Sequence, residues 1–228
     1  SAEHPYLYRV LVKTDTDERT IPFGIRKLCW SAENGLTVNG EQVLLRGGCI
    51  HHDHGVLGAC DYLDAEERRI RILKENGFNA VRISHNPASQ ITLDVCDKLG
   101  MYVMNETFDG WYIPKTYHDY ARRFASDWRL DATAMVESSR NHPSVIIYSI
   151  GNEVSETATP KGVAACKELT EFVHSLDNTR PVTAGVNVLL NVYANMGMGV
   201  YRDKGNYKPE PLPQGKGYQG KKTGSAFF

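Results

Sequence analysis

The stretch VIIYSIGNE, residues 145–153, decides the fold of this chain. Its first four residues are apolar on both faces, as in a strand buried inside a parallel sheet. The stretch then ends in a polar pair, Asn152 and Glu153. In parallel α/β folds the functional site forms at the carboxyl ends of the strands, because the loops that follow the strands converge there. We therefore expect a parallel α/β fold with Asn152 and Glu153 in its site.

Four further apolar runs predict more strands, beginning near residues 43, 79, 101 and 181. Helix signals lie between the runs: a pattern similar to a capping box from Asp64, N-cap residues at Ser89 and Thr159, and a terminating Gly100. Alternating strands and helices predict a parallel sheet. Eight such units would need about 280 residues, near the usual size of a (β/α)8 TIM barrel. Five units indicate either a small open α/β domain or a partial barrel, about strands 1–5.

The two ends of the chain have a different character. Residues 7–14 and 21–26 predict two strands, which cannot bury a core by themselves, so residues 1–28 should be the end of a sheet domain. Residues 36–38 and 42–44 predict a small hairpin around Asn39-Gly40. Residues 29–198 would then hold the barrel part. Residues 199–228 contain six Gly, three Pro and five Lys, which predicts a long loop or linker, and the chain looks truncated there.

Composition excludes several classes of partner. Lys and Arg number 26 and Asp and Glu 27, a net charge of −1, so the chain has no overall field to attract nucleic acid or an anionic membrane. No apolar run approaches the roughly 20 residues that span a bilayer. Five cysteines without a CxxC pattern disfavour a disulfide framework and favour buried free thiols. The sequence leaves the compartment open among cytoplasm, periplasm and secretion.

Histidines follow the first two predicted strands. Residues 51–54, His-His-Asp-His, suggest a metal site, but alternation along a strand divides them between two faces, so we favour substrate contact by His51. His85 follows the second strand and is either a site residue or a loop histidine bonded to the backbone. Arg82 lies within that strand and needs an acidic partner if it is buried.

Acidic and aromatic residues follow the third and fourth strands. Glu106, Asp109 and Trp111 follow the third, and the Trp111 indole could stack on a sugar or belong to the core. Glu153 is either a general acid, since a carboxyl group at a partly apolar strand end can have a raised pKa, or a solvated loop acid. His51, His85, Asp109 and Glu153 thus fall at the same end of four successive strands. A purely structural role for these four residues explains this coincidence poorly.

Two long motifs resemble signatures of glycoside hydrolase family 2, the group of β-galactosidases, β-glucuronidases and β-mannosidases. They are NAVRISHNP at residues 79–87 and RNHPSVIIYSIGNE at residues 140–153, with Tyr148 where the family usually has Trp. Residues 23–26, 36–40 and 45–47 resemble the family's junction between an immunoglobulin-like β-sandwich domain and the barrel. The His-His-Asp form at residues 51–53 resembles the β-galactosidase-like branch.

The resemblance implies a retaining reaction on a carbohydrate substrate, carried out by two glutamates. Glu153 matches the acid/base, and Asn152 matches its neighbour that holds the sugar 2-hydroxyl. His51 and His85 match residues that touch the sugar, and Arg82 matches one that supports the nucleophile. We add Asp109 and Trp111 as candidate sugar contacts from their position.

The family's second glutamate has no match here. The acids after Glu153 fall in a predicted helix or in loops, and none follows an apolar strand. We therefore expect this chain to carry the acid/base without the nucleophile, to need the remainder of the polypeptide and to be inactive alone. We expect no cofactor: a divalent cation near Glu153 is disfavoured, because the Glu-x-His pair that holds magnesium in some members has no match around residues 106–109.

The expected activity is that of a β-galactosidase acting on terminal β-galactosides in carbohydrate catabolism. A β-glucuronidase or β-mannosidase is the alternative within the family, and a non-catalytic sugar-binding or structural module is the alternative outside it. Five strands leave two open sheet edges, at residues 43–48 and 181–186, and we expect Val81, Ile83, Val103 and Ile147 to be uncovered on the inner face. These edges suggest a homodimer, or the 199–228 segment folding back.

Overall fold

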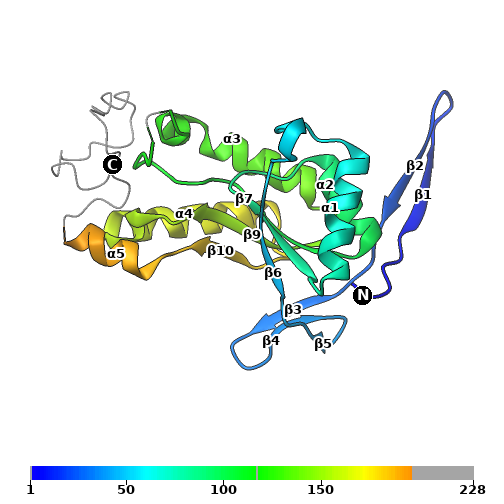
Figure 1. Cartoon of the computed structure of the whole chain (residues 1–228), viewed down its shortest axis with the longest axis horizontal. Coiled ribbons are helices and arrows are strands. Elements are labelled where there is room, and N and C mark those ends of the chain that lie inside the picture. The colour runs from blue at the N-terminus through cyan, green and yellow to red at the C-terminus, as the bar shows by residue number, and fades with distance from the viewer. Residues whose placement is uncertain (1, 117, 197–228) are drawn as a thin grey trace.

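The computed structural model describes residues 2–116 and 118–196, and its centre is a five-stranded parallel sheet (Figure 1). The strand order is β10-β9-β8-β7-β6, so the neighbours in sequence are also neighbours in space. The strands are β6 (Gly47–His51), β7 (Ala80–Ser84), β8 (Tyr102–Glu106), β9 (Val145–Asn152) and β10 (Val182–Gly185). The predicted partial barrel is confirmed. The first strand begins later than expected, because the Val43 N–H donates to the Leu36 carbonyl and so belongs to the preceding hairpin.

Helices follow the strands as an α/β fold requires. They are α1 (Leu63–Glu75), α2 (Gln90–Leu99), α3 (Ala121–Ser139), α4 (Pro160–Leu176) and α5 (Val188–Asn195), with short 3-10 helices η1 (Gly55–Leu57) and η2 (Ser155–Ala158). The main core lies between helices and sheet, where Val81, Val103 and Tyr148 of the strands meet Leu93, Val136 and Leu169 of the helices.

The inner face of the sheet is less apolar than expected. Val81, Ile83 and Val103 are 2%, 2% and 0% exposed and belong to the helix-side core, so the prediction that they face inward is wrong. Alternation along the strands gives the inner positions to Arg82 and Glu106 instead. The two side chains contact each other on this face. Of the four apolar residues that we expected on the inner face, only Ile147 packs with the second, smaller apolar cluster.

Two of the three predicted helix starts are confirmed. Ser89 Oγ accepts the Thr92 N–H at 3.0 Å, and Thr159 Oγ1 accepts the Gly162 N–H at 3.1 Å. Gly100 ends α2 in the left-handed conformation, at φ 72°. The capping box from Asp64 is wrong: α1 begins at Leu63 without a side-chain cap.

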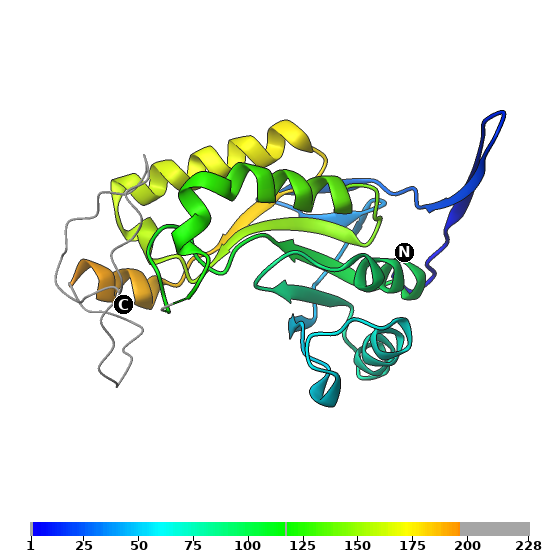
Figure 2. The same ribbon diagram turned by 90° about the horizontal axis from the view of Figure 1, so that it is seen from above.

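The N-terminal part forms two small antiparallel sheets. Strands β1 (Tyr8–Lys13) and β2 (Glu18–Phe23) make a hairpin that projects away from the barrel part (Figures 1 and 2). The second strand lies earlier than predicted, because Lys13 pairs with Glu18 across the turn. Whether this hairpin ends a β-sandwich domain stays a prediction.

Strands β3 (Leu28–Ser31), β4 (Gly35–Val38) and β5 (Glu41–Gln42) form the other small sheet. Its Val38 packs against Ala80, Tyr102 and Ile146 of the parallel sheet. The hairpin therefore covers the amino-terminal end of the sheet's inner face and leaves the carboxyl end for polar residues.

The edges of the parallel sheet are β6 and β10, as predicted, whereas the homodimer stays a prediction. The 199–228 segment lies outside the described residues.

All five cysteines are free, and the expectation of burial is wrong for Cys29, Cys49 and Cys60, which are exposed. Cys49 is exposed because it lies on the edge strand β6. Within residues 2–116 and 118–196, none of the helices combines the length and apolar character needed to cross a bilayer.

The N-cap of α4 gives a stability prediction. Replacing Thr159 by Ala removes the acceptor for the Gly162 N–H and should lower the free energy of unfolding by about 1 kcal/mol. Thr159→Ser keeps a hydroxyl acceptor and should retain most of that stability. Urea unfolding of the two variants, followed by circular dichroism, measures the difference; equal stabilities would contradict the capping role.

Candidate active site

The carboxyl end of the sheet is organised around one buried carboxylate, Glu106. It is the last residue of β8 and is 0% exposed. Its Oε2 accepts from Arg82 Nε at 2.9 Å and from Ser149 Oγ at 2.5 Å, and its Oε1 lies 2.6 Å from His85 Nδ1. The expectation that Arg82 needs an acidic partner is confirmed. Strands β7, β8 and β9 are thus joined at this end by charge-assisted hydrogen bonds, which are the strong ones.

Asn152 extends this network toward the loop after β8. Its Oδ1 accepts from Arg82 Nη2 at 3.0 Å, and its Nδ2 donates to Asp109 Oδ1 at 2.9 Å. Lys115 Nζ donates to both the Asn152 carbonyl and Asp109 Oδ1, at 2.8 and 2.9 Å. Burial alone would raise the pKa of Asp109, but the bonds from Lys115 and Asn152 outweigh it and hold that pKa below its usual value. Asp109 is therefore an anion that fixes the Asn152 amide.

The two predicted histidines lie together. The rings of His51, at the end of β6, and His85, just after β7, meet edge to face with their centroids 5.2 Å apart. The alternative for His85, a loop histidine bonded to the backbone, is not what the structure has, because its Nδ1 lies on the Glu106 carboxylate. Both imidazoles thus reach the same end of the sheet as Asn152.

Glu153 follows β9 directly and has an unusual backbone. Its φ is 45°, in the left-handed region that non-glycine residues seldom adopt and that costs on the order of 1 kcal/mol or more. The side chain is partly buried. This conformation turns the chain out of the strand between Asn152 and η2. An uncommon backbone at a strand end beside a polar network points to function.

Trp111 belongs to the core. The residue is 0% exposed, and its Nε1 donates to the Ile150 carbonyl at 2.7 Å. Its ring lies against Gly151, where an added Cβ would come within 2.7 Å of Nε1. The indole therefore offers no face to a sugar in this structure, and the core alternative holds. The close approach also explains why a glycine precedes Asn152.

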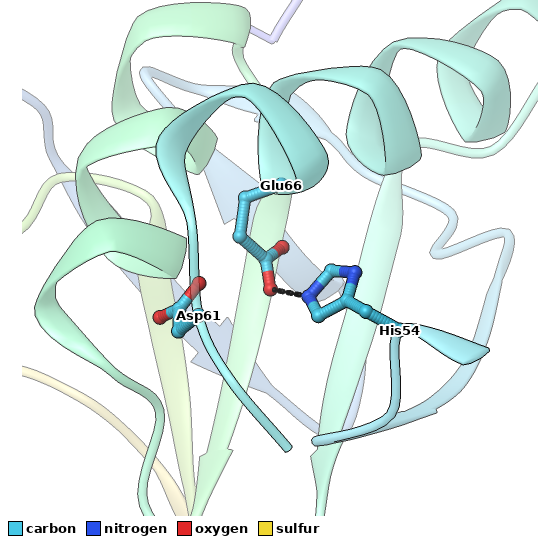
Figure 3. A group of neighbouring side chains, drawn as sticks. All are labelled: His54, Asp61 and Glu66. Carbon is cyan, nitrogen blue, oxygen red and sulfur yellow. Dashed lines mark hydrogen bonds and ion pairs between the residues drawn. The ribbon is translucent and has the colours of Figure 1, made fainter. Parts of the chain in front are cut away.

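Residues 51–54 do not converge on one point. Asp53 Oδ1 accepts the Gly55 N–H at 2.8 Å, whereas His54 Nε2 lies 2.8 Å from Glu66 Oε1 on α1. His54, Asp61 and Glu66 place potential metal-ligand atoms within 4.8 Å of one another (Figure 3). Only His54 of this group belongs to the four residues, 51–54, that the sequence suggested.

A guanidinium already serves the His54–Asp61–Glu66 group. Arg69 bonds the Glu66 carboxylate and also donates to the His51 carbonyl at 2.9 Å. The positive charge that a metal would supply to Glu66 thus comes from Arg69. Together with Arg69, the group ties the end of β6 and the loop that follows it to α1.

A second group, Asp94, Asp97 and His142, also places possible ligand atoms close together. His142 Nδ1 lies 2.6 Å from Asp97 Oδ2, and Asp97 Oδ1 accepts the Ser144 N–H at 2.9 Å. These bonds connect α2 to the segment before β9. Both oxygens of the Asp97 carboxylate thus have protein partners.

The role of Arg69 predicts the response to metal removal. We expect EDTA to leave the midpoint of thermal unfolding of the chain unchanged, because Arg69 rather than a metal neutralises Glu66. Differential scanning fluorimetry before and after dialysis against EDTA measures this. A lower midpoint that one equivalent of a divalent cation restores would show that the group holds a metal.

Three residues of the network were not predicted as site residues. Glu106 and Ser149 had a usable signal, since each lies near the end of a predicted strand, and they pair across β8 and β9. Lys115 lies in the loop after β8, where no periodicity indicates the direction of a side chain. Of the predicted residues, His51 contacts His85, Asn152 bonds both Arg82 and Asp109, and Glu153 follows Asn152 in the chain.

Comparison with known proteins identifies relatives of this arrangement. Residues 32–214 match the model of the TIM barrel domain of glycosyl hydrolases family 2. A β-galactosidase of Bacteroides ovatus is 41% identical over 219 residues, which cover 80% of this chain and 26% of that protein.

Solved structures of glycosidases are also similar to this chain. A glycosyl hydrolase family 2 member from Bacteroides cellulosilyticus has a TM-score of 0.78 and 52% identity, covering 82% of this chain and 25% of that chain. A β-glucuronidase of Parabacteroides merdae has a TM-score of 0.64 and 30% identity, covering 80% and 24%. The chain thus spans about a quarter of the length of these relatives.

Proposed function

The chain belongs to glycoside hydrolase family 2, and on that premise we propose that the whole protein is a retaining glycosidase that hydrolyses terminal β-galactosides. The observation that carries the proposal is the position of Glu153, directly after β9 at a left-handed φ and beside Asn152. A carboxylic acid in this place can protonate the leaving oxygen of a glycoside, and the resulting carboxylate can then activate water.

We propose Asn152 and His85 as sugar contacts. An amide nitrogen carries two N–H groups, so the bond from Asn152 Nδ2 to Asp109 leaves the second for a sugar hydroxyl. His51 faces His85 and adds a second imidazole to the same surface. Asp109 acts through Asn152, whose amide orientation it fixes.

A retaining glycosidase needs a second carboxylate about 5 Å from the first. The acids that follow Glu153 within the described residues have other partners: Glu156 accepts the Ile113 N–H, Asp177 bonds Arg180, and Glu168 and Glu171 lie in α4. We propose that the nucleophile comes from the remainder of the polypeptide. We assign its support to Arg82, because within the described residues the contact of Nη1 is with a weak acceptor, Cys49 Sγ at 3.8 Å.

The relatives support two sugars. The B. ovatus relative is named a β-galactosidase, which supports galactosides, and the P. merdae structure is that of a β-glucuronidase, which supports glucuronides as the second candidate. A panel of nitrophenyl β-glycosides, including the β-mannoside, separates these on the full-length protein. A protein that binds these sugars without hydrolysing any of them would be the non-catalytic module instead.

The role of Glu153 predicts how its replacement depends on the leaving group. Glu153→Gln in the full-length enzyme should slow hydrolysis by roughly 100-fold or more for poor leaving groups and much less for activated ones, because only poor leaving groups need the proton. Azide should restore turnover of activated substrates. The measurement is kcat/KM for a series of aryl glycosides; equal losses across the series, without azide rescue, would refute an acid/base role.

Because the described residues supply no second catalytic carboxylate, we predict that the 228-residue chain is inactive. Loss of one member of a catalytic pair commonly costs several orders of magnitude in rate. Hydrolysis of any nitrophenyl glycoside by the purified chain, abolished by Glu153→Gln, would place a second catalytic carboxylate within these residues. The Glu153→Gln chain is the control for contaminating glycosidases.

A further inference from the structure

We propose that Glu106 is a positioning residue of this site, which fixes the orientation of His85 and Arg82 without touching the sugar. The proposal rests on the proposed function, and it assigns a role to a residue behind the candidate sugar-binding surface. Glu106 is 0% exposed, whereas the side chains of His85 and Arg82, which it contacts, are 21% and 25% exposed. The carboxylate therefore lies behind the two groups that can reach a ligand.

The bond to His85 determines which ring nitrogen faces the site. Glu106 is ionised when it pairs with Arg82, so its Oε1 can only accept a hydrogen bond. The 2.6 Å contact then requires a proton on His85 Nδ1. In the neutral ring this leaves Nε2 as an acceptor for a sugar hydroxyl. Without the carboxylate, the ring would lose both its tautomer preference and its fixed orientation.

The bonds to Arg82 determine which edge of the guanidinium remains for other groups. Oε2 takes Nε and Nη2, and Nη2 also bonds Asn152 Oδ1. The Nη1 edge is left for a further carboxylate. Ser149, opposite Glu106 on β9, donates to the same Oε2 and fixes the carboxylate in turn. One side chain thus sets the geometry of His85 on one side and of Asn152, through Arg82, on the other.

A purely structural role would be different in its consequences. A counter-ion that only neutralised Arg82 would affect stability, and it would have no influence on the tautomer of His85 or on catalysis in a folded variant. A positioning residue affects both. The two roles can therefore be separated by a direct measurement on His85 and by kinetics.

The first measurement uses the 228-residue chain and needs no activity. In ¹⁵N-histidine NMR, at a pH where the ring is neutral, we expect His85 to show the form protonated on Nδ1, with the signals assigned by their loss in His85→Ala. Glu106→Gln should abolish that preference, since an amide can donate as well as accept. Glu156→Gln is the matched control, because Glu156 is likewise buried, at 2% exposed, but bonds the Ile113 N–H, and it should leave His85 unchanged. A His85 protonated on Nε2, or unaffected by Glu106→Gln, would overturn the proposal.

The second measurement uses the full-length enzyme. Glu106→Gln should reduce kcat/KM by about 10- to 100-fold in a protein that remains folded, the usual effect of losing a residue that orients a functional group. Its cost should be smaller in a His85→Ala background, because part of its effect acts through that ring. Unchanged kcat/KM in folded Glu106→Gln, or losses from Glu106→Gln and His85→Ala that multiply fully in the double variant, would overturn the proposal.

A third variant covers the case in which Glu106→Gln does not fold. Glu106→Asp keeps the charge beside Arg82 but is shorter by one methylene, so it should fold and still lose kcat/KM and the His85 tautomer preference. Wild-type behaviour of Glu106→Asp in both measurements would overturn the proposal. If the wild-type protein hydrolyses none of the glycosides, the proposed function fails, and the NMR result still decides whether Glu106 positions His85.

Discussion

The burial of the Glu106 carboxylate is the constraint on which the rest of the site depends. Removing a charge from water costs several kcal/mol, and only well-placed partners can offset that cost. Here the partners come from both neighbouring strands: Arg82 in the middle of β7, His85 just beyond the end of that strand, and Ser149 on β9. A shift of one residue in either strand would turn these side chains to the other face and leave the charge unpaired. The same interaction that orders the site therefore also fixes the register of three strands.

The inner face of the sheet is divided along its length. At the amino-terminal end, Val38 of the small hairpin covers Ala80, Tyr102 and Ile146. At the carboxyl end the positions belong to Arg82, Glu106 and Ser149. This division follows from the strand sequences, in which an apolar start is followed by polar residues at the last inner positions. An apolar floor beneath a charged network keeps water from one side of it, which strengthens every electrostatic interaction above.

Prediction from the sequence succeeded where the signal is local or periodic. The parallel strands and the caps at Ser89 and Thr159 depend on alternation, on strand length and on hydrogen bonds within one turn. The capping box at Asp64 failed because α1 already begins at Leu63, and Glu67, which would complete the pattern, pairs with Lys98 of α2.

Long-range packing accounts for the other failures. Trp111 could be placed in the core or the site only by knowing that Gly151 lies beneath its ring. Glu106 went unassigned because its role depends on contacts with Arg82 and His85, 24 and 21 residues away in the chain. The strand end was visible in the sequence, and the partner was not.

Tyr148 shows how a departure from the family pattern fits the same logic. The family usually has Trp there, and in this chain the Tyr148 hydroxyl donates to Asp177 Oδ2 at 2.9 Å. Burial would raise the pKa of Asp177, but bonds from Thr179, the charge of Arg180 and this hydroxyl hold it below its usual value. Arg180 in turn donates from Nε to the Val145 carbonyl at 2.7 Å. An indole N–H lies elsewhere on its ring than a phenol hydroxyl, so the tyrosine and this acceptor belong together. Strand β9 is thus held on its helix side through Tyr148 and on its inner side through Ser149, and Glu153 follows a strand whose two faces are both fixed.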